Sequence, residues 1–180
     1  RSLYGECPDV LSYEDYQAKM QGLADAADVP DTVDAVPWAV RCWIFDEIRK
    51  ANGLGIFAHP NWKRDAYHVP EKFTDYMMEK QPFDAFEVLG GESYFHQNGL
   101  QTALYYDEYR EGRVHPIVGS TDTHGSTDEN DNAAICTTIV FAKANERTAI
   151  IDAVRNRYSV AVDTISSEYR LVGELRYQHY

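Results

Sequence analysis

The residues best suited to chemistry come directly after short apolar segments. Asp122 and His124 follow the apolar run 116–118, which Gly119 ends. Alternate side chains of an extended chain point the same way, so an extended form that persists to residue 124 turns both toward one spot. A carboxylate oxygen and a neutral imidazole nitrogen together suit zinc, manganese or iron. The alternative is a polar loop in which Asp122 caps the next turn and His124 lies in water.

A second histidine ends another apolar segment. The run 54–58 leads into His59, and Pro60 both stops the strand and favours an extended conformation at His59. In parallel α/β folds, the C-terminal ends of neighbouring strands are where sites are built. We therefore predict that His59, Asp122 and His124 are ligands of one divalent metal ion. The alternative is that the motifs are coincidental and the two histidines lie far apart.

Glu87 is a carboxylate in an otherwise apolar strand, predicted over 83–89. Burying a carboxylate is costly unless it has a partner. Glu87 either faces the end of the sheet and orients a ligand or water, or it forms a structural salt bridge. The sequence leaves both interpretations open.

A polar, aromatic loop follows His59 over residues 61–68. Asn61, Lys63 and Arg64 are candidates for binding a substrate, and the two cationic side chains suit a phosphate or carboxylate group. The alternative is an exposed loop with ordinary surface charge.

The elements that must position these residues alternate along the chain. The alternation of helix and strand from Pro37 to Ser120 predicts a sheet of mainly parallel strands with helices outside, and sites at the C-terminal strand ends. A last segment, 168–177, alternates apolar and polar residues and predicts an edge strand. The other predicted helices lie at about 12–27, 70–80, 100–111 and 145–156, and the later strands at 134–141 and 158–162.

In several motifs, and in their order, the chain resembles the PHP (polymerase and histidinol phosphatase) family of metal-dependent phosphoesterases. The similar segments are G-I-F-A-H-P at 55–60, F-D-A-F-E-V at 83–88, G-S-T-D-T-H-G at 119–125, and the strand–helix–strand segment 137–163. Together they span about residues 40–163 and are nearest to the carbaryl-esterase-like branch. The resemblance implies a single domain over 1–180 that forms part of a distorted TIM-type barrel.

The resemblance also implies a function. It points to metal-dependent hydrolysis of a small-molecule phosphoester or related ester, with a zinc, manganese or iron cofactor held by His59, Asp122 and His124. Asp122, His124 and Glu87 become the catalytic candidates.

PHP domains carry an H-x-H pair and further ligands before the A-H-P strand, yet residues 1–58 contain no histidine. We therefore expect this chain to be the C-terminal part of a longer protein, whose N-terminal part is its possible partner. The alternative is a degenerate, non-catalytic scaffold or binding module.

Composition narrows the classes of partner. The chain has 180 residues, a net charge of −12 and 44% hydrophobic residues, which predicts a globular domain that does not bind nucleic-acid backbones. Apolar runs are of strand length, which predicts no membrane span. The three cysteines are widely separated, which favours free thiols and a cytoplasmic location.

Overall fold

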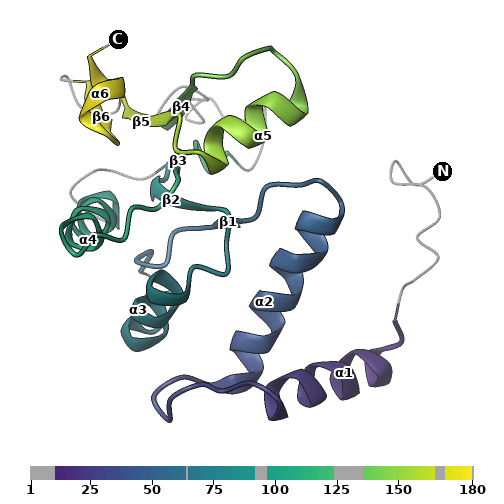
Figure 1. Cartoon of the computed structure of the whole chain (residues 1–180). Coiled ribbons are helices and arrows are strands. Elements are labelled where there is room, and N and C mark those ends of the chain that lie inside the picture. The colour runs from purple at the N-terminus through teal and green to yellow at the C-terminus, as the bar shows by residue number, and fades with distance from the viewer. Residues whose placement is uncertain (1–10, 64, 92–96, 124–135, 165–168, 180) are drawn as a thin grey trace.

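The computed structural model describes residues 11–63, 65–91, 97–123, 136–164 and 169–179. Helices and strands alternate through most of the chain, so the predicted mixed α/β class is confirmed (Figure 1). The elements are α1 (Tyr13–Asp25), α2 (Ala35–Lys50), β1 (Ile56–Phe57), α3 (Glu71–Lys80), β2 (Ala85–Leu89), α4 (Gly99–Arg110), β3 (Ile117–Gly119), β4 (Cys136–Val140), α5 (Arg147–Arg155), β5 (Ser159–Asp163), β6 (Arg170–Val172) and α6 (Leu175–Gln178).

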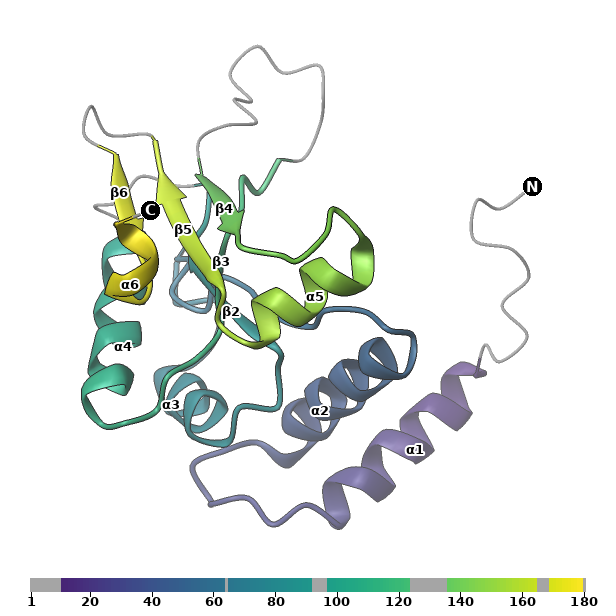
Figure 2. The ribbon, with the colours of Figure 1, turned by 45° about the horizontal axis from the view of Figure 1, so that its top comes forward.

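The first sheet contains β1, β2 and β3, all parallel and in that order. Helices connect these strands, α3 between β1 and β2 and α4 between β2 and β3. Outside them, α1 packs along α2 at the edge of the molecule (Figure 2). Because the strands are parallel, their C-terminal ends meet at one edge of the sheet, as the site prediction requires.

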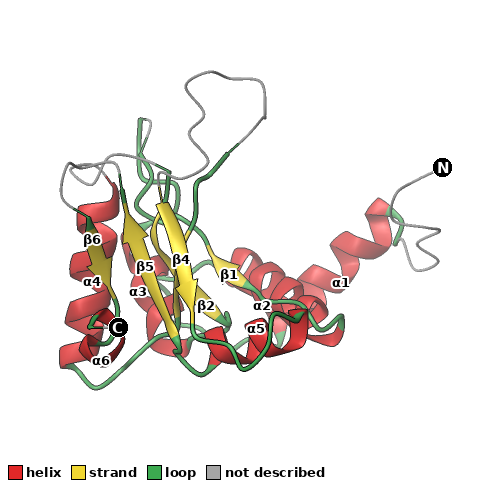
Figure 3. Ribbon diagram, turned by 90° about the horizontal axis from the view of Figure 1, so that it is seen from above, coloured by secondary structure: helices red, strands yellow, loops and turns green. Residues whose placement is uncertain are grey.

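The second sheet corrects the expectation of mainly parallel strands. β4, β5 and β6 are antiparallel neighbours (Figure 3), with Cys136 opposite Asp163 and Val140 opposite Ser159. The segment with α5 therefore leaves and re-enters the sheet at the same end, where the Phe141 N–H donates to the Tyr158 carbonyl at 2.8 Å. A parallel pair would instead have required α5 to cross from one end of the sheet to the other. Within the described residues, the strands do not close into a barrel.

The last predicted strand is also shorter than expected. β6 ends at Val172, Gly173 has φ +151°, and Leu175–Gln178 form the helical turn α6. Only glycine adopts that backbone conformation readily, so the extended chain stops there. The alternation of apolar and polar residues over 168–177 therefore predicted the presence of a strand correctly but overestimated its length.

The core lies around the parallel sheet. All five residues of β2 are buried. The Phe57 ring packs against the rings of Phe83 and of Phe86 in β2. Met77 and Met78 of α3 are fully buried. Such continuous burial is typical of a parallel strand covered on both faces. It also means that Glu87, in the middle of β2, must have partners.

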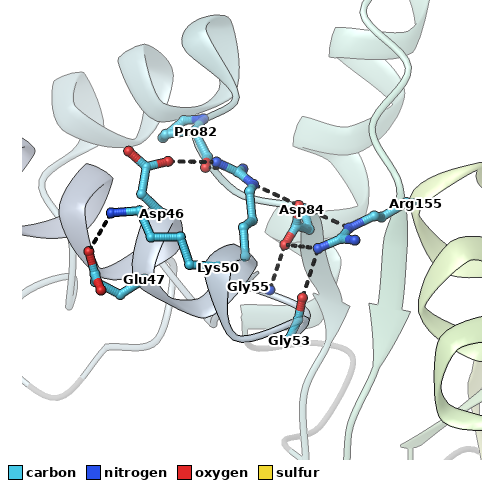
Figure 4. Close-up of polar contacts among 9 residues, drawn as sticks. Asp46, Glu47, Lys50, Gly53, Gly55, Pro82, Asp84 and Arg155 are labelled. Carbon is cyan, nitrogen blue, oxygen red and sulfur yellow. Dashed lines mark hydrogen bonds and ion pairs between the residues drawn. The ribbon is translucent and has the colours of Figure 1, made fainter.

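A buried carboxylate marks the opposite, N-terminal end of the parallel strands (Figure 4). Asp84 Oδ2 accepts from the Gly55 N–H at 2.8 Å, while Oδ1 accepts from Arg49 Nε of α2 at 2.9 Å and Arg155 Nε of α5 at 3.3 Å. Arg155 also donates to the Gly53 carbonyl at 2.7 Å. One side chain thus joins α2, α5 and the starts of β1 and β2.

The two sheets touch where β3 ends. The Gly119 N–H donates to Thr138 Oγ1 at 2.9 Å, and the Thr138 hydroxyl donates to the Gly119 carbonyl at 2.7 Å. A Cβ on Gly119 would lie 2.5 Å from the Thr137 carbonyl oxygen and 3.3 Å from Ala161 Cβ. Only glycine allows the strands to approach this closely.

Replacing Gly119 with alanine is therefore expected to destabilise the fold by about 1–3 kcal/mol, the usual range for overpacking. Urea denaturation measures the loss. Gly22 in α1 is the control, because a Cβ there meets nothing within 4 Å. Gly22→Ala is expected to stabilise by about 0.5–1 kcal/mol through helix propensity. Equal effects of the two substitutions would contradict the close approach of the sheets.

Among the helices of the described chain, none has the length and apolar character needed to cross a membrane.

Candidate functional site

The centre of the candidate site is a contact between Glu87 of β2 and His59, two residues beyond the end of β1. Glu87 Oε2 accepts from the His59 backbone N–H at 2.8 Å and from ring Nδ1 at 2.9 Å. The Glu87 side chain is 5% exposed and that of His59 25%. The Ser120 hydroxyl, one residue beyond β3, donates to Glu87 Oε1. The ends of all three parallel strands are thus joined through one carboxylate.

His59 has an unusual backbone conformation. Its φ is +26°, whereas Pro60 led us to expect an extended residue, so that expectation was wrong. Two interactions hold the turn: the bond from its own N–H to Glu87, and the bond from the Trp62 N–H to its carbonyl at 3.0 Å. Strained residues of this kind cost about 1–3 kcal/mol and occur often at functional sites.

Asp122 shares this property. The non-glycine residues of the described chain with positive φ are Asn52, His59, Gln81, Asp122 and Arg157. Three of them lie at or just after the ends of α2, α3 and α5, where a left-handed residue commonly ends a helix. The remaining two, His59 and Asp122, are predicted metal ligands beyond strand ends. The two positive φ angles that no helix end explains therefore belong to residues of the predicted site.

The φ of +51° at Asp122 also corrects the prediction that the chain stays extended as far as His124. An extended chain from β3 to residue 124 was expected to align Asp122 with His124, but the extension has ended by Asp122. Gly91 lies against this turn, since a Cβ on it would be 1.9 Å from the Thr121 carbonyl oxygen and 3.2 Å from Asp122 Cβ. His124 itself lies outside the described residues.

Electrostatics place Asp122 in the same neighbourhood as His59. The Glu87 hydrogen bond raises the pKa of His59 above its ordinary value; burial opposes this, and the charges of Glu87 and Asp122 add to the rise. The structure thus brings His59 and Glu87 of the predicted site into contact, with Asp122 near enough for its charge to act on the imidazole.

The loop after His59 turns back on itself. The His68 N–H donates to the Trp62 carbonyl at 2.7 Å, and the His68 ring stacks on the His59 ring with centroids 5.6 Å apart. Neither His68 nor Ser120 was among the predicted site residues. Ser120 does follow Gly119 in the G-S-T-D-T-H-G motif, which was a usable signal. Nothing in sequence spacing points to His68.

The structure gives a different result for each of the three predicted substrate-binding residues. Asn61 has a buried Oδ1 atom with no hydrogen-bond partner in the described part of the chain. Lys63 is exposed, and its Nζ lies 5.3 Å from the centre of the Tyr67 ring. Arg64 lies outside the described residues. Asn61 is therefore the better supported of the two described candidates.

The described residues offer an incomplete set of ligands for a divalent ion. Among the described residues, no three His, Cys, Asp or Glu side chains gather closely enough to hold one ion. His59 has the arrangement common to metal-binding imidazoles, in which one ring nitrogen is bonded to a carboxylate. Glu108 makes a similar contact with His115, but that ring is only 1% exposed. The described groups therefore fit part of a metal site.

Comparison with protein-family models, with curated proteins and with solved structures finds no match to this chain.

Proposed function

We propose that this chain carries part of the active site of a metal-dependent hydrolase that cleaves a phosphoester or a related ester. The observation that carries the proposal is the double acceptance by Glu87 from the backbone N–H and ring Nδ1 of His59. Nδ1–H donation to a carboxylate fixes the tautomer and leaves the Nε2 lone pair for a cation. The PHP-like motif order supports the same reading.

In this proposal His59, Asp122 and His124 hold a zinc, manganese or iron ion, which when bound would polarise the ester and lower the pKa of water. Glu87 orients His59 through two hydrogen bonds, and Ser120 orients Glu87 in turn. Positioning of this kind keeps the imidazole in one orientation before any ligand arrives. Asp122 supplies a negative charge that favours cation binding and orients the nucleophile.

A metal titration tests this proposal. The chain is expected to bind Zn²⁺ or Mn²⁺ in isothermal titration calorimetry, and His59→Ala or His124→Ala is expected to weaken binding at least about 100-fold, since each removes a ligand. His179→Ala is the control, because His179 is an exposed imidazole beyond α6. Hydrolysis of p-nitrophenyl phosphate and p-nitrophenyl acetate is then measured with the bound metal.

Two results would contradict the proposal. If the chain binds neither ion, the non-catalytic scaffold is the better description. If His59→Ala and His179→Ala weaken binding equally, the metal binds elsewhere on this acidic chain.

A further inference from the structure

Two amide side chains at the start of α4, one from its N-cap residue Asn98 and one from Gln101, bind the end of β2. Asn98 Oδ1 accepts from the Gly90 N–H at 2.8 Å, and Asn98 Nδ2 donates to the Gly90 carbonyl at 3.0 Å. One turn later, Gln101 Nε2 donates to the Glu87 carbonyl at 3.1 Å. Both amides are fully buried. These bonds fix the start of α4 against the strand that carries Glu87.

Gln97, directly before them, is buried without such bonds. It is 4% exposed, and its Oε1 atom has no hydrogen-bond partner in the described part of the chain. A Cβ on Gly90 would lie 2.7 Å from Gln97 Nε2 and 3.5 Å from Glu87 Oε2, so the two side chains converge on the same glycine. The amide group of Gln97 therefore lies near the carboxylate that binds His59.

Asn61, two residues after His59, repeats this pattern in part. Its Oδ1 is also buried and has no partner among the described residues. Gln101 Oε1 is unpartnered as well, but Gln101 Nε2 is bonded to β2, which accounts for the burial of that side chain. A carboxamide oxygen only accepts hydrogen bonds, and a buried acceptor without a donor is costly.

We propose that Asn61 and Gln97 bind hydroxyl or ammonium groups of the substrate through their carboxamide oxygens. This inference rests on the proposed function and narrows its substrate class to phosphoesters or esters whose alcohol part carries further hydrogen-bond donors. Negative charge near the site favours hydrogen-bond donors on the substrate, because Glu87 and Asp122 are acidic and the chain carries a net charge of −12. A site built to bind such donors discriminates strongly against analogues that lack them.

The first test needs no ligand. Gln97→Met keeps the side-chain length and removes the unpaired acceptor, so it is expected to raise the Tm of the metal-free chain by about 2–4 °C. Gln101→Met is the matched control one turn along α4. It removes a donor to the Glu87 and Val88 carbonyls and is expected to lower the Tm.

The second test measures selectivity by calorimetry in Mn²⁺. Glycerol 2-phosphate is expected to bind about tenfold more tightly than isopropyl phosphate, which lacks both hydroxyl groups. O-phosphoethanolamine against ethyl phosphate makes the same comparison for an ammonium group. For each pair, the selectivity is the ratio of the two dissociation constants. Gln97→Met is expected to reduce the larger of these two ratios at least threefold, while Gln101→Met leaves it unchanged.

Support requires both a higher Tm and a reduced ratio in Gln97→Met. A lower Tm, an unchanged ratio, or a wild-type chain with no preference in either pair would overturn the inference. Loss of Mn²⁺ affinity in Gln97→Met would also overturn it and assign Gln97 to the metal instead. If the wild-type chain binds no metal, the proposed function fails; the Tm comparison and the ratios without metal still decide the role of Gln97.

Discussion

Replacing Glu87 with alanine is expected to weaken divalent-metal binding about 10–100-fold, the usual effect of removing the carboxylate that orients a metal-binding imidazole. The Glu87 side chain is 5% exposed and accepts from both His59 donors, so the truncation also leaves those donors without their partner. We therefore expect a loss of stability of about 1–3 kcal/mol for the metal-free chain. Calorimetric titration and urea denaturation measure the two effects separately.

Glu108 provides the control for this prediction. Its Oε2 lies 3.1 Å from His115 Nε2, so it is also a carboxylate bonded to a histidine, between α4 and the segment before β3. Glu108→Ala is expected to lower stability and to leave metal affinity unchanged. If the two substitutions weaken metal binding equally, Glu87 acts only through the fold and not through His59.

The pH dependence of metal binding is an independent test of the contact between Glu87 and His59. Glu87 raises the pKa of His59, and a metal binds only the deprotonated nitrogen, so affinity is expected to increase as pH rises through this raised pKa. In Glu87→Gln the pKa falls back toward the ordinary value of about 6.5, and the midpoint of the affinity profile moves to lower pH. A midpoint that does not move would show that His59 is not the titrating ligand.

The sequence was most informative where a local pattern determines local structure. Sequence patterns placed β2 and α3 within a few residues of their observed bounds, since a strand was predicted over 83–89 and a helix over 70–80. The same reasoning placed His59 at the C-terminal ends of the parallel strands, because parallel strands joined by helices have those ends on the same side of the sheet. The sequence left open whether Glu87 would face that end or form a structural salt bridge.

It was least informative where backbone conformation depends on distant contacts. The positive φ of His59 accompanies a hydrogen bond from its N–H to a carboxylate of β2, and that of Asp122 accompanies close packing of Gly91 against the preceding residue. Neither partner is near in sequence. The antiparallel second sheet escaped prediction for a similar reason: a helix between two strands does not reveal whether the chain crosses the sheet or returns on the same edge.

Asp84 is the other residue whose loss is expected to have a large effect, on folding rather than on the site. Asp84→Asn is expected to destabilise the chain by about 2–4 kcal/mol, because it removes the charge that the guanidinium groups of Arg49 and Arg155 share in a buried position. Asp46→Asn is the control, since Asp46 is 61% exposed and pairs with the same Arg49 at the surface. Its effect is expected to stay within about 0.5 kcal/mol.

The pH dependence of this loss has a definite sign. Burial disfavours the charged form of Asp84, but the Gly55 N–H, Arg49 and Arg155 outweigh it, so the pKa of Asp84 lies below its ordinary value. A carboxyl whose pKa is lower in the folded state stabilises the fold above the unfolded pKa of about 3.9, and this contribution is lost as pH falls through the folded pKa. The stability difference between wild type and Asp84→Asn in urea is therefore expected to be constant near neutral pH and to shrink below about pH 4. A difference that stays the same at pH 3 would mean that Asp84 acts through shape and hydrogen bonding alone, and that its charge does not join α2 and α5 to the sheet.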